Sequence, residues 1–268
     1  MNKQASEYYQ SKKENKDAIF DEVIALHENA AEIELSDLQS KSKGFQKGFY
    51  ELAKLSKKDR IDFTCSFWET TLPYSPKLHE FLTLFFARVD DIGIYFVRKE
   101  VDPEFTPHLV YSLSDEETFF RGFPSALPEE VEKLKTDLQV IMPEDYLGFL
   151  KIHNGFAKDG DFGVIQVFDV CSEMNIVQNE AMQMTNKPIF QQKPIDPNCL
   201  IPFYKSNDCN VFECFYKGWY PDKEMGNVLL SLGEGKKIDY SDPTTRIKKL
   251  AFPTFLDWLM NYMEPFDV

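Results

Sequence analysis

The chain has 268 residues, of which 44 are acidic and 30 are basic, so its formal net charge is −14. A field of this sign repels phosphate backbones and anionic lipid head groups, and we therefore expect no binding to nucleic acid or to a membrane. The same field favours a basic protein partner, although an excess of acid can also serve only to keep a protein soluble. The sequence leaves both interpretations open.

The N-terminus is polar, and no stretch approaches the roughly 18 apolar residues that a membrane span requires. The five cysteines are odd in number and have no Cys-x-x-Cys spacing, which argues against a disulfide framework and a zinc site. With 43% hydrophobic residues the composition is that of a folded globular protein. We expect a cytoplasmic protein without a metal or another cofactor.

Residues 1–123 are predicted to form a mainly helical region with a β-hairpin. Helices are expected over 7–28, over 45–55 and from about residues 37, 57 and 76, with Ser36, Ser56 and Ser75 in capping positions. Residues 92–97 show the two-residue alternation of a strand and residues 108–113 form a second β-rich run, and together they predict the hairpin. Ser114 is expected to cap a further helix. Two apolar stripes are expected to be core: Ile61, Cys65 and Trp68 with Phe67 beside them, and Leu78, Phe81, Leu82 and Phe85.

A turn-rich break at 121–125 places a domain boundary there, so that 124–268 is predicted to be a second domain. Helices are expected from Pro128, from Pro143 to Asn154-Gly155, through 171–184 and from Pro253. Strands are expected over 163–170, 200–204, 211–216 and 227–232. This order of elements predicts an α+β domain.

Three pieces of the second half recur in a known family. They are residues 142–150 (Met-Pro-Glu-Asp-Tyr-Leu-Gly-Phe-Leu) with Asn154-Gly155, residues 201–204 (Ile-Pro-Phe-Tyr) and residues 255–259 (Phe-Leu-Asp-Trp-Leu). In their order and spacing they resemble the SUKH superfamily over about 127–263, whereas the first half resembles no family. The resemblance implies a mixed or antiparallel sheet flanked by helices and a binding role without catalysis. The resemblance further implies one of two roles: that of an immunity protein that blocks a toxin, often a nuclease, as for many bacterial members, or that of an interaction scaffold, as for other relatives.

Motifs for catalysis or metal binding are incomplete throughout the chain. Cys199, Cys209 and Cys214 have no histidine nearby, and small buried hydrophobic residues are the better interpretation. The Asp-Phe-Gly at 161–163 lacks the other kinase motifs and the later ligands of a calcium loop, so we interpret it as a loop before a strand. The glycine-rich segment 231–237 lacks the spacing of a phosphate loop. We expect no catalytic residue, and therefore no enzyme.

An aromatic cluster is the one candidate site, because Trp and Tyr are favoured anchors at protein interfaces. It lies in the turn-like stretch from Tyr216 to Asp222, with acidic residues expected around it as a rim. The predicted partner-binding residues are Asp159, Asp161, Asp208, Glu213, Tyr216, Trp219 and Tyr220. The alternative is that Trp219 folds back onto the sheet edge as local core.

Two functional hypotheses follow. In the first, the protein is a non-enzymatic binding protein, for example an immunity protein that occludes a basic toxin. In the second, it is a regulatory or scaffold protein whose two halves bind separate partners.

Overall fold

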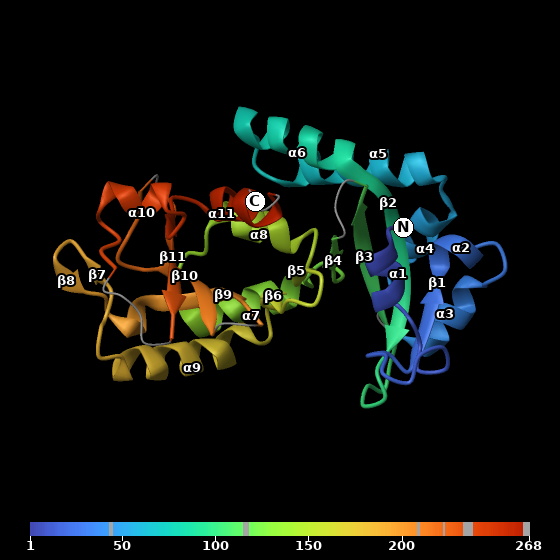
Figure 1. Ribbon diagram of the computed structural model, residues 1–268, viewed down its shortest axis with the longest axis horizontal. Coiled ribbons are helices and arrows are strands. Elements are labelled where there is room, and N and C mark those ends of the chain that lie inside the picture. Colours follow the sequence, from blue (N-terminus) through green and yellow to red (C-terminus); the bar gives the residue numbers. More distant parts are fainter. Residues whose placement is uncertain (43–44, 115–117, 208–209, 222, 233–237, 265–268) are drawn as a thin grey trace. The chain divides into compact units, whose positions relative to one another are not determined.

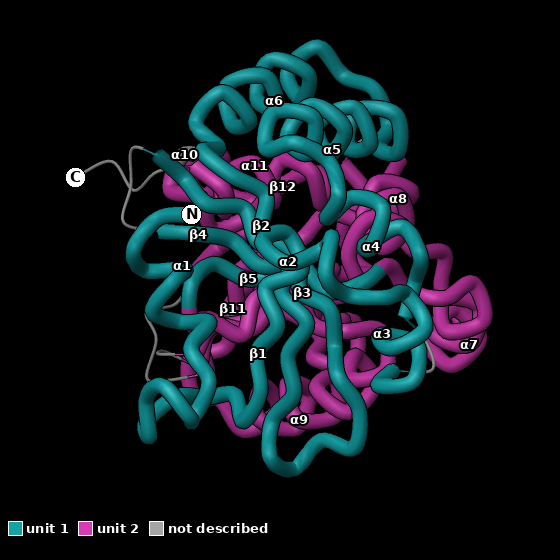
Figure 2. The backbone as a smooth tube through the Cα atoms, turned by 90° about the vertical axis from the view of Figure 1, so that its right-hand side faces the viewer, with its two compact units in different colours: residues 1–124, 156–159 teal, residues 125–155, 160–268 magenta. Residues whose placement is uncertain are grey.

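The computed structural model describes the chain except for residues 43–44, 115–117, 208–209, 222, 233–237 and 265–268. The chain divides into two compact units, which Figure 2 shows in different colours. The first contains residues 1–124 and 156–159, and the second contains residues 125–155 and 160–268. Both units combine helices with an antiparallel sheet, so the α+β class is confirmed. The independent folding of residues 124–268 stays a prediction. Residues 156–159 lie within this predicted domain but belong to the first compact unit.

The first unit is built on a five-stranded antiparallel sheet. Its strands, in spatial order, are β1 (Glu22–Ala25), β2 (Val89–Arg98), β3 (Thr106–Leu113), β4 (Phe119–Gly122) and β5 (Phe156–Lys158). The two long central strands form the expected hairpin, with Ile94 opposite Leu109. The sheet is nevertheless larger than a hairpin, because β1, β4 and β5 extend it on both sides.

Six helices accompany this sheet. They are α1 (Lys3–Tyr8), α2 (Leu26–Asn29), α3 (Leu35–Lys41), α4 (Lys47–Lys54), α5 (Lys57–Thr71) and α6 (Pro76–Arg88). The α5 and α6 helices pack against each other and against β2 (Figure 1). Their starts agree with the predicted caps, since Ser56 Oγ accepts from the N–H of Asp59 and Ser75 Oγ from that of Leu78. In α3 the cap is Glu34 rather than Ser36.

The prediction of one helix over 7–28 is wrong. The chain leaves α1 at Tyr8 and later joins the sheet as β1, where Glu22 stands opposite Arg98 of β2. Arg98 donates to both Asp21 (2.6 Å) and Glu22 (2.7 Å), which fixes β1 at the sheet edge. The helix predicted to begin at Ser114 would include residues 115–117, which lie outside the described residues. Residues 119–122, which follow, form strand β4.

The buried face of α5 also differs from the predicted stripe. Arg60, Thr64 and Trp68 are buried, whereas Phe63 and Phe67 are exposed. The polar groups are buried because each has a partner: Arg60 donates to Asp91 (2.7 Å) and Trp68 Nε1 to the hydroxyl of Tyr111 (2.9 Å) on the sheet, and Thr64 donates to the carbonyl of Arg60 (2.7 Å) within the helix. In α6 the prediction holds better, since Leu78, Leu82 and Phe85 are all core.

The second unit contains another antiparallel sheet. Its strands, in spatial order, are β6 (Gly163–Val164), β9 (Leu200–Lys205), β10 (Val211–Tyr216), β11 (Asn227–Ser231) and β12 (Ala251–Phe252). The strand predicted over 163–170 is much shorter, because the side chain of Asn154 accepts the N–H of Val167 at 2.8 Å and diverts the chain toward the next helix. A separate two-stranded ribbon pairs β7 (Ile189–Phe190) with β8 (Lys193–Pro194).

Helices cover both faces of this second sheet. They are α7 (Pro128–Leu138), α8 (Glu144–Leu150), α9 (Val170–Gln183), α10 (Pro243–Ile247) and α11 (Phe255–Met263), with a 3-10 turn at Pro197–Cys199. On one face, Val177 of α9 packs with Phe212 and Cys214 of β10. On the other, Tyr146 of α8 lies against Phe215, with ring centres 5.2 Å apart. Successive residues of β10 therefore enter two different cores.

Glu213 lies inside this unit rather than on an acidic rim, so its predicted surface role is wrong. Its side chain is 0% exposed, and neither carboxylate oxygen has a hydrogen-bond partner within the described part of the chain. Burial raises the pKa of Glu213 well above its ordinary value of 4.5. Burial therefore favours the protonated form of Glu213, because an unpaired charge inside a core is strongly disfavoured.

Replacing Glu213 by Gln should remove a pH dependence of stability. A raised pKa stabilises the folded state fully below pH 4.5, and this contribution is lost as the pH rises toward the folded-state pKa. Relative to Glu213→Gln, the parent protein should lose up to about 1.4 kcal/mol of unfolding free energy per pH unit above pH 4.5. Urea denaturation of both proteins between pH 5 and pH 8 measures this difference, and parallel curves would contradict the buried position.

Trp258→Ala should destabilise the second unit by about 3–5 kcal/mol, because it empties a buried aromatic site. Trp258 is 3% exposed, and its ring centre lies 4.9 Å from that of Phe203 and 5.1 Å from that of Tyr204. Thermal unfolding followed by circular dichroism measures the loss. Tyr220→Ala is the matched control at an exposed aromatic residue and should change the stability by less than about 0.5 kcal/mol.

Candidate partner-binding surface

The predicted aromatic cluster is mostly part of the second unit's core. Tyr216 is buried at the end of β10, and the Trp219 ring packs 6.1 Å from Phe190 against the cluster that contains Val177. Gly226 permits this position, since a Cβ atom there would lie 2.4 Å from the Trp219 ring. The structure thus agrees with the alternative that Trp219 is local core. Tyr220, which is 53% exposed, is left as the accessible aromatic residue of the three.

Asp161 is an anchor for its own loop rather than a free rim charge. Its carboxylate accepts the hydroxyl protons of Tyr204 (2.8 Å) and Tyr262 (3.1 Å) and the backbone N–H of Asn207 (2.9 Å). These three donors come from β9, α11 and the turn after β9. The carboxylate therefore ties three segments together at the base of the 160–169 loop.

Of the other predicted acidic residues, the structure places Asp159 and Glu213. Asp159 belongs to the first compact unit, where it accepts from Thr118 Oγ1 (2.8 Å) and the N–H of Phe119 (3.0 Å). Glu213 is buried, and Asp208 lies outside the described residues. Among the residues that the structure describes, the predicted acidic residues therefore do not surround the predicted aromatic residues.

A different aromatic group is exposed on the second unit, and sequence reasoning missed it. Phe162 is 57% exposed and Phe168 is 66% exposed, on either side of β6 in the segment whose start Asp161 anchors. Lys205 lies beside the Phe162 ring and pairs with Glu173, and Asp169 follows Phe168 in the chain. We call these five residues the Phe162 surface. The sequence did contain a signal for this exposure. Asp169 stands directly before the apolar periodicity of α9, as expected of a residue that begins a helix. The strand should therefore end before Asp169, which leaves Phe168 outside the strand.

The charges of the Phe162 surface are organised around Lys205. Its ammonium group lies 2.9 and 3.1 Å from the two oxygens of Glu173 and 5.4 Å from the centre of the Phe162 ring. Partial burial and the nearby Glu173 charge raise the pKa of Asp169, which the Lys205 charge partly offsets. Two carboxylates and one ammonium group leave one net negative charge beside two exposed rings.

The composition of the Phe162 surface is typical of a protein interface. Exposed aromatic rings with a polar surround are the usual composition of a protein interface. Across the residues that the structure describes, no group of three or more His, Cys, Asp or Glu side chains is arranged to hold a metal ion. Over the same residues, none of the helices has the length and apolar character needed to cross a membrane.

Comparison with known proteins identifies the second unit. The sequence profile of the SMI1 / KNR4 family (SUKH-1) matches residues 125–261, which is slightly more than half of the chain. A search among curated proteins found no match. The profile covers the α8 helix, the sheet from β6 to β12 and nearly all of α11, so the resemblance found in the sequence is confirmed. The chain belongs to the SMI1 / KNR4 (SUKH-1) family.

Proposed function

We propose that this protein acts by stoichiometric binding to another protein, without turnover, and that its SUKH-1 unit makes the contact through the Phe162 surface. The observation that carries this proposal is the exposure of Phe162 and Phe168 on a loop that Asp161 holds in place. Aromatic side chains that are already immobilised lose little conformational entropy on binding, which makes them effective anchors.

Family membership supports a binding role, because SUKH domains are generally protein-interaction domains. The net charge of −14 supports a basic partner, since complementary charge accelerates association. An immunity protein that covers a basic toxin is the specific form of the proposal that combines these properties. Inhibition would then follow from occlusion, and no residue of this chain would need to react.

A second function is favoured by one observation on the first unit. Phe63 and Phe67 lie one helical turn apart on the exposed face of α5. This apolar face belongs to the unit outside the family match, so a scaffold protein with a separate partner for each unit is the alternative. Each of the two surfaces can be altered without touching the other.

The double variant Phe162→Ser/Phe168→Ser should lose the partner of the second unit. Each exposed ring that acts as an anchor should contribute about 2 kcal/mol or more, so the dissociation constant should rise at least about thirtyfold. Immobilised parent and variant proteins would be exposed to lysate of the native cells, and the captured proteins compared by quantitative mass spectrometry. Binding of the purified partner would then be titrated by calorimetry to obtain the stoichiometry.

Ile141→Ser is the matched control, because Ile141 is a 90% exposed apolar residue of the same unit outside the Phe162 surface. It should retain the partner at parental affinity. A partner that both variants keep equally would refute the Phe162 surface as the contact. A different partner that is lost only in Phe63→Ser/Phe67→Ser would support the scaffold alternative.

A further inference from the structure

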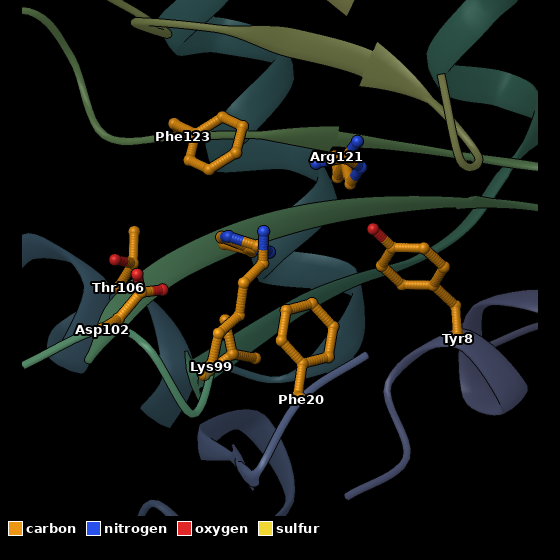
Figure 3. Close-up of a pocket in the computed structure, with 9 residues that line it drawn as sticks. Tyr8, Phe20, Lys99, Asp102, Thr106, Arg121 and Phe123 are labelled. Atoms are coloured by element: carbon orange, nitrogen blue, oxygen red, sulfur yellow. The ribbon is translucent and has the colours of Figure 1, made fainter. Parts of the chain in front are cut away.

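The first unit contains a pocket of about 90 Å³ beside its N-terminal segment (Figure 3). Aromatic rings form part of its wall, with Tyr8 and Phe20 from the N-terminal segment and Phe123 from the end of β4. Pockets for drug-sized ligands have volumes of roughly 300–1,000 Å³, so this pocket suits one small chemical group.

Two cationic side chains reach the pocket from different strands. Lys99 follows β2 and extends toward the middle of the view in Figure 3, and Arg121 lies in β4. The guanidinium carbon of Arg121 lies 5.6 Å from the centre of the Tyr8 ring, and its Nε donates to the carbonyl of Asp159. No ion pair of Lys99 is found within the described part of the chain. Asp102 is the one acidic lining residue, so the pocket is locally positive in a chain of charge −14.

The buried His108 completes the polar lining. Its Nδ1 atom lies 2.9 Å from the hydroxyl of Tyr9. Burial, together with the charges of Arg121 and Lys99, lowers the pKa of His108 to about 3, so the ring is neutral near pH 7. When Tyr9 donates to Nδ1, the proton of the neutral ring is on Nε2, which is then a donor. Lys99 and Arg121 therefore line the pocket together with a neutral ring whose Nε2–H can serve as a donor.

We propose that this pocket binds a small oxyanion, namely a phosphate or a carboxylate group, held between Lys99 and Arg121. A guanidinium group offers parallel N–H donors that match an oxyanion, and a lysine adds a compact positive charge. Thr106 supplies a hydroxyl at the rim. The site lies in the first unit and is independent of the function proposed for the SUKH-1 unit.

An oxyanion at this position would connect the N-terminal segment to the sheet. Tyr8 and Phe20 come from the segment, whereas Lys99 and Arg121 come from the sheet side. The N–H of Lys12 bonds to the carbonyl of Phe20 at 2.9 Å within this segment. Binding should therefore slow hydrogen exchange at the Lys12 amide, in addition to raising the melting temperature.

The test is calorimetric titration of the full chain with inorganic phosphate and, separately, with malonate, at constant ionic strength near pH 7. Saturable binding of at least one anion is expected, with a melting temperature that rises with occupancy. Lys99→Gln should weaken binding at least tenfold, since a charge-assisted hydrogen bond is lost. Lys99→Arg should remain within about threefold of the parent because it keeps the charge. The anion that binds more tightly distinguishes a phosphate ligand from a carboxylate one.

Lys58→Gln is the matched control, because it removes the same charge from an exposed lysine at the start of α5, away from the pocket. It should bind the anion like the parent. Equal weakening in Lys58→Gln and Lys99→Gln would show a general charge effect and overturn the proposal. Failure of both anions to saturate at millimolar concentrations would overturn it as well. Unchanged melting temperatures of the variants without anion show that the fold is intact.

Discussion

The second unit depends on one buried carboxylate, that of Asp145, because it fixes two helices that are far apart in the sequence. The carboxylate accepts the N–H of Tyr146 (2.8 Å) at the start of α8 and the N–H of Leu256 (2.9 Å) at the start of α11. Burial raises its pKa to about 6 even though these amides favour the charged form. Since α11 carries Phe255 and Trp258 into the core, this bond determines where the closing helix meets the sheet.

The position of α11 in turn determines how the binding loop is held. Tyr262 in the last turn of α11 donates to Asp161, the residue immediately before Phe162, and Tyr204 of β9 donates to the same carboxylate. A change at the Asp145 bond would thus be transmitted through α11 to the base of the loop. The proposed surface is therefore supported by packed secondary structure, which suits an anchor that must not lose its orientation before docking.

The range of each interaction explains which features the sequence could predict. Ser56 and Ser75 cap helices through bonds to residues three positions later, and both starts were predicted correctly. The helix expected over 7–28 was wrong because β1 forms through Arg98, more than 70 residues away. Glu213 was placed on the surface because its own strand cannot reveal that helices cover both faces of the sheet. Asp161 was predicted to be a rim charge that contacts a partner, and its anchoring role could not be foreseen because its donors Tyr204 and Tyr262 are 43 and 101 residues away.

The buried carboxyl groups of the two units respond to pH in opposite directions. In the second unit, the raised pKa values of Asp145 and Glu213 give a stability contribution that is lost as the pH rises, for Asp145 through about 6. In the first unit, burial opposes ionisation of Asp91, but the hydrogen bond and charge of Arg60 bring its pKa below the ordinary value. The stability that Asp91 contributes is lost as the pH falls. The same holds for His108, because burial lowers its pKa from 6.5 to about 3 and the folded state therefore disfavours the protonated ring. Acid therefore disfavours the folded form through Asp91 and His108, and base through Asp145 and Glu213, because Asp91 is paired with Arg60 whereas burial opposes ionisation of the other two carboxyl groups.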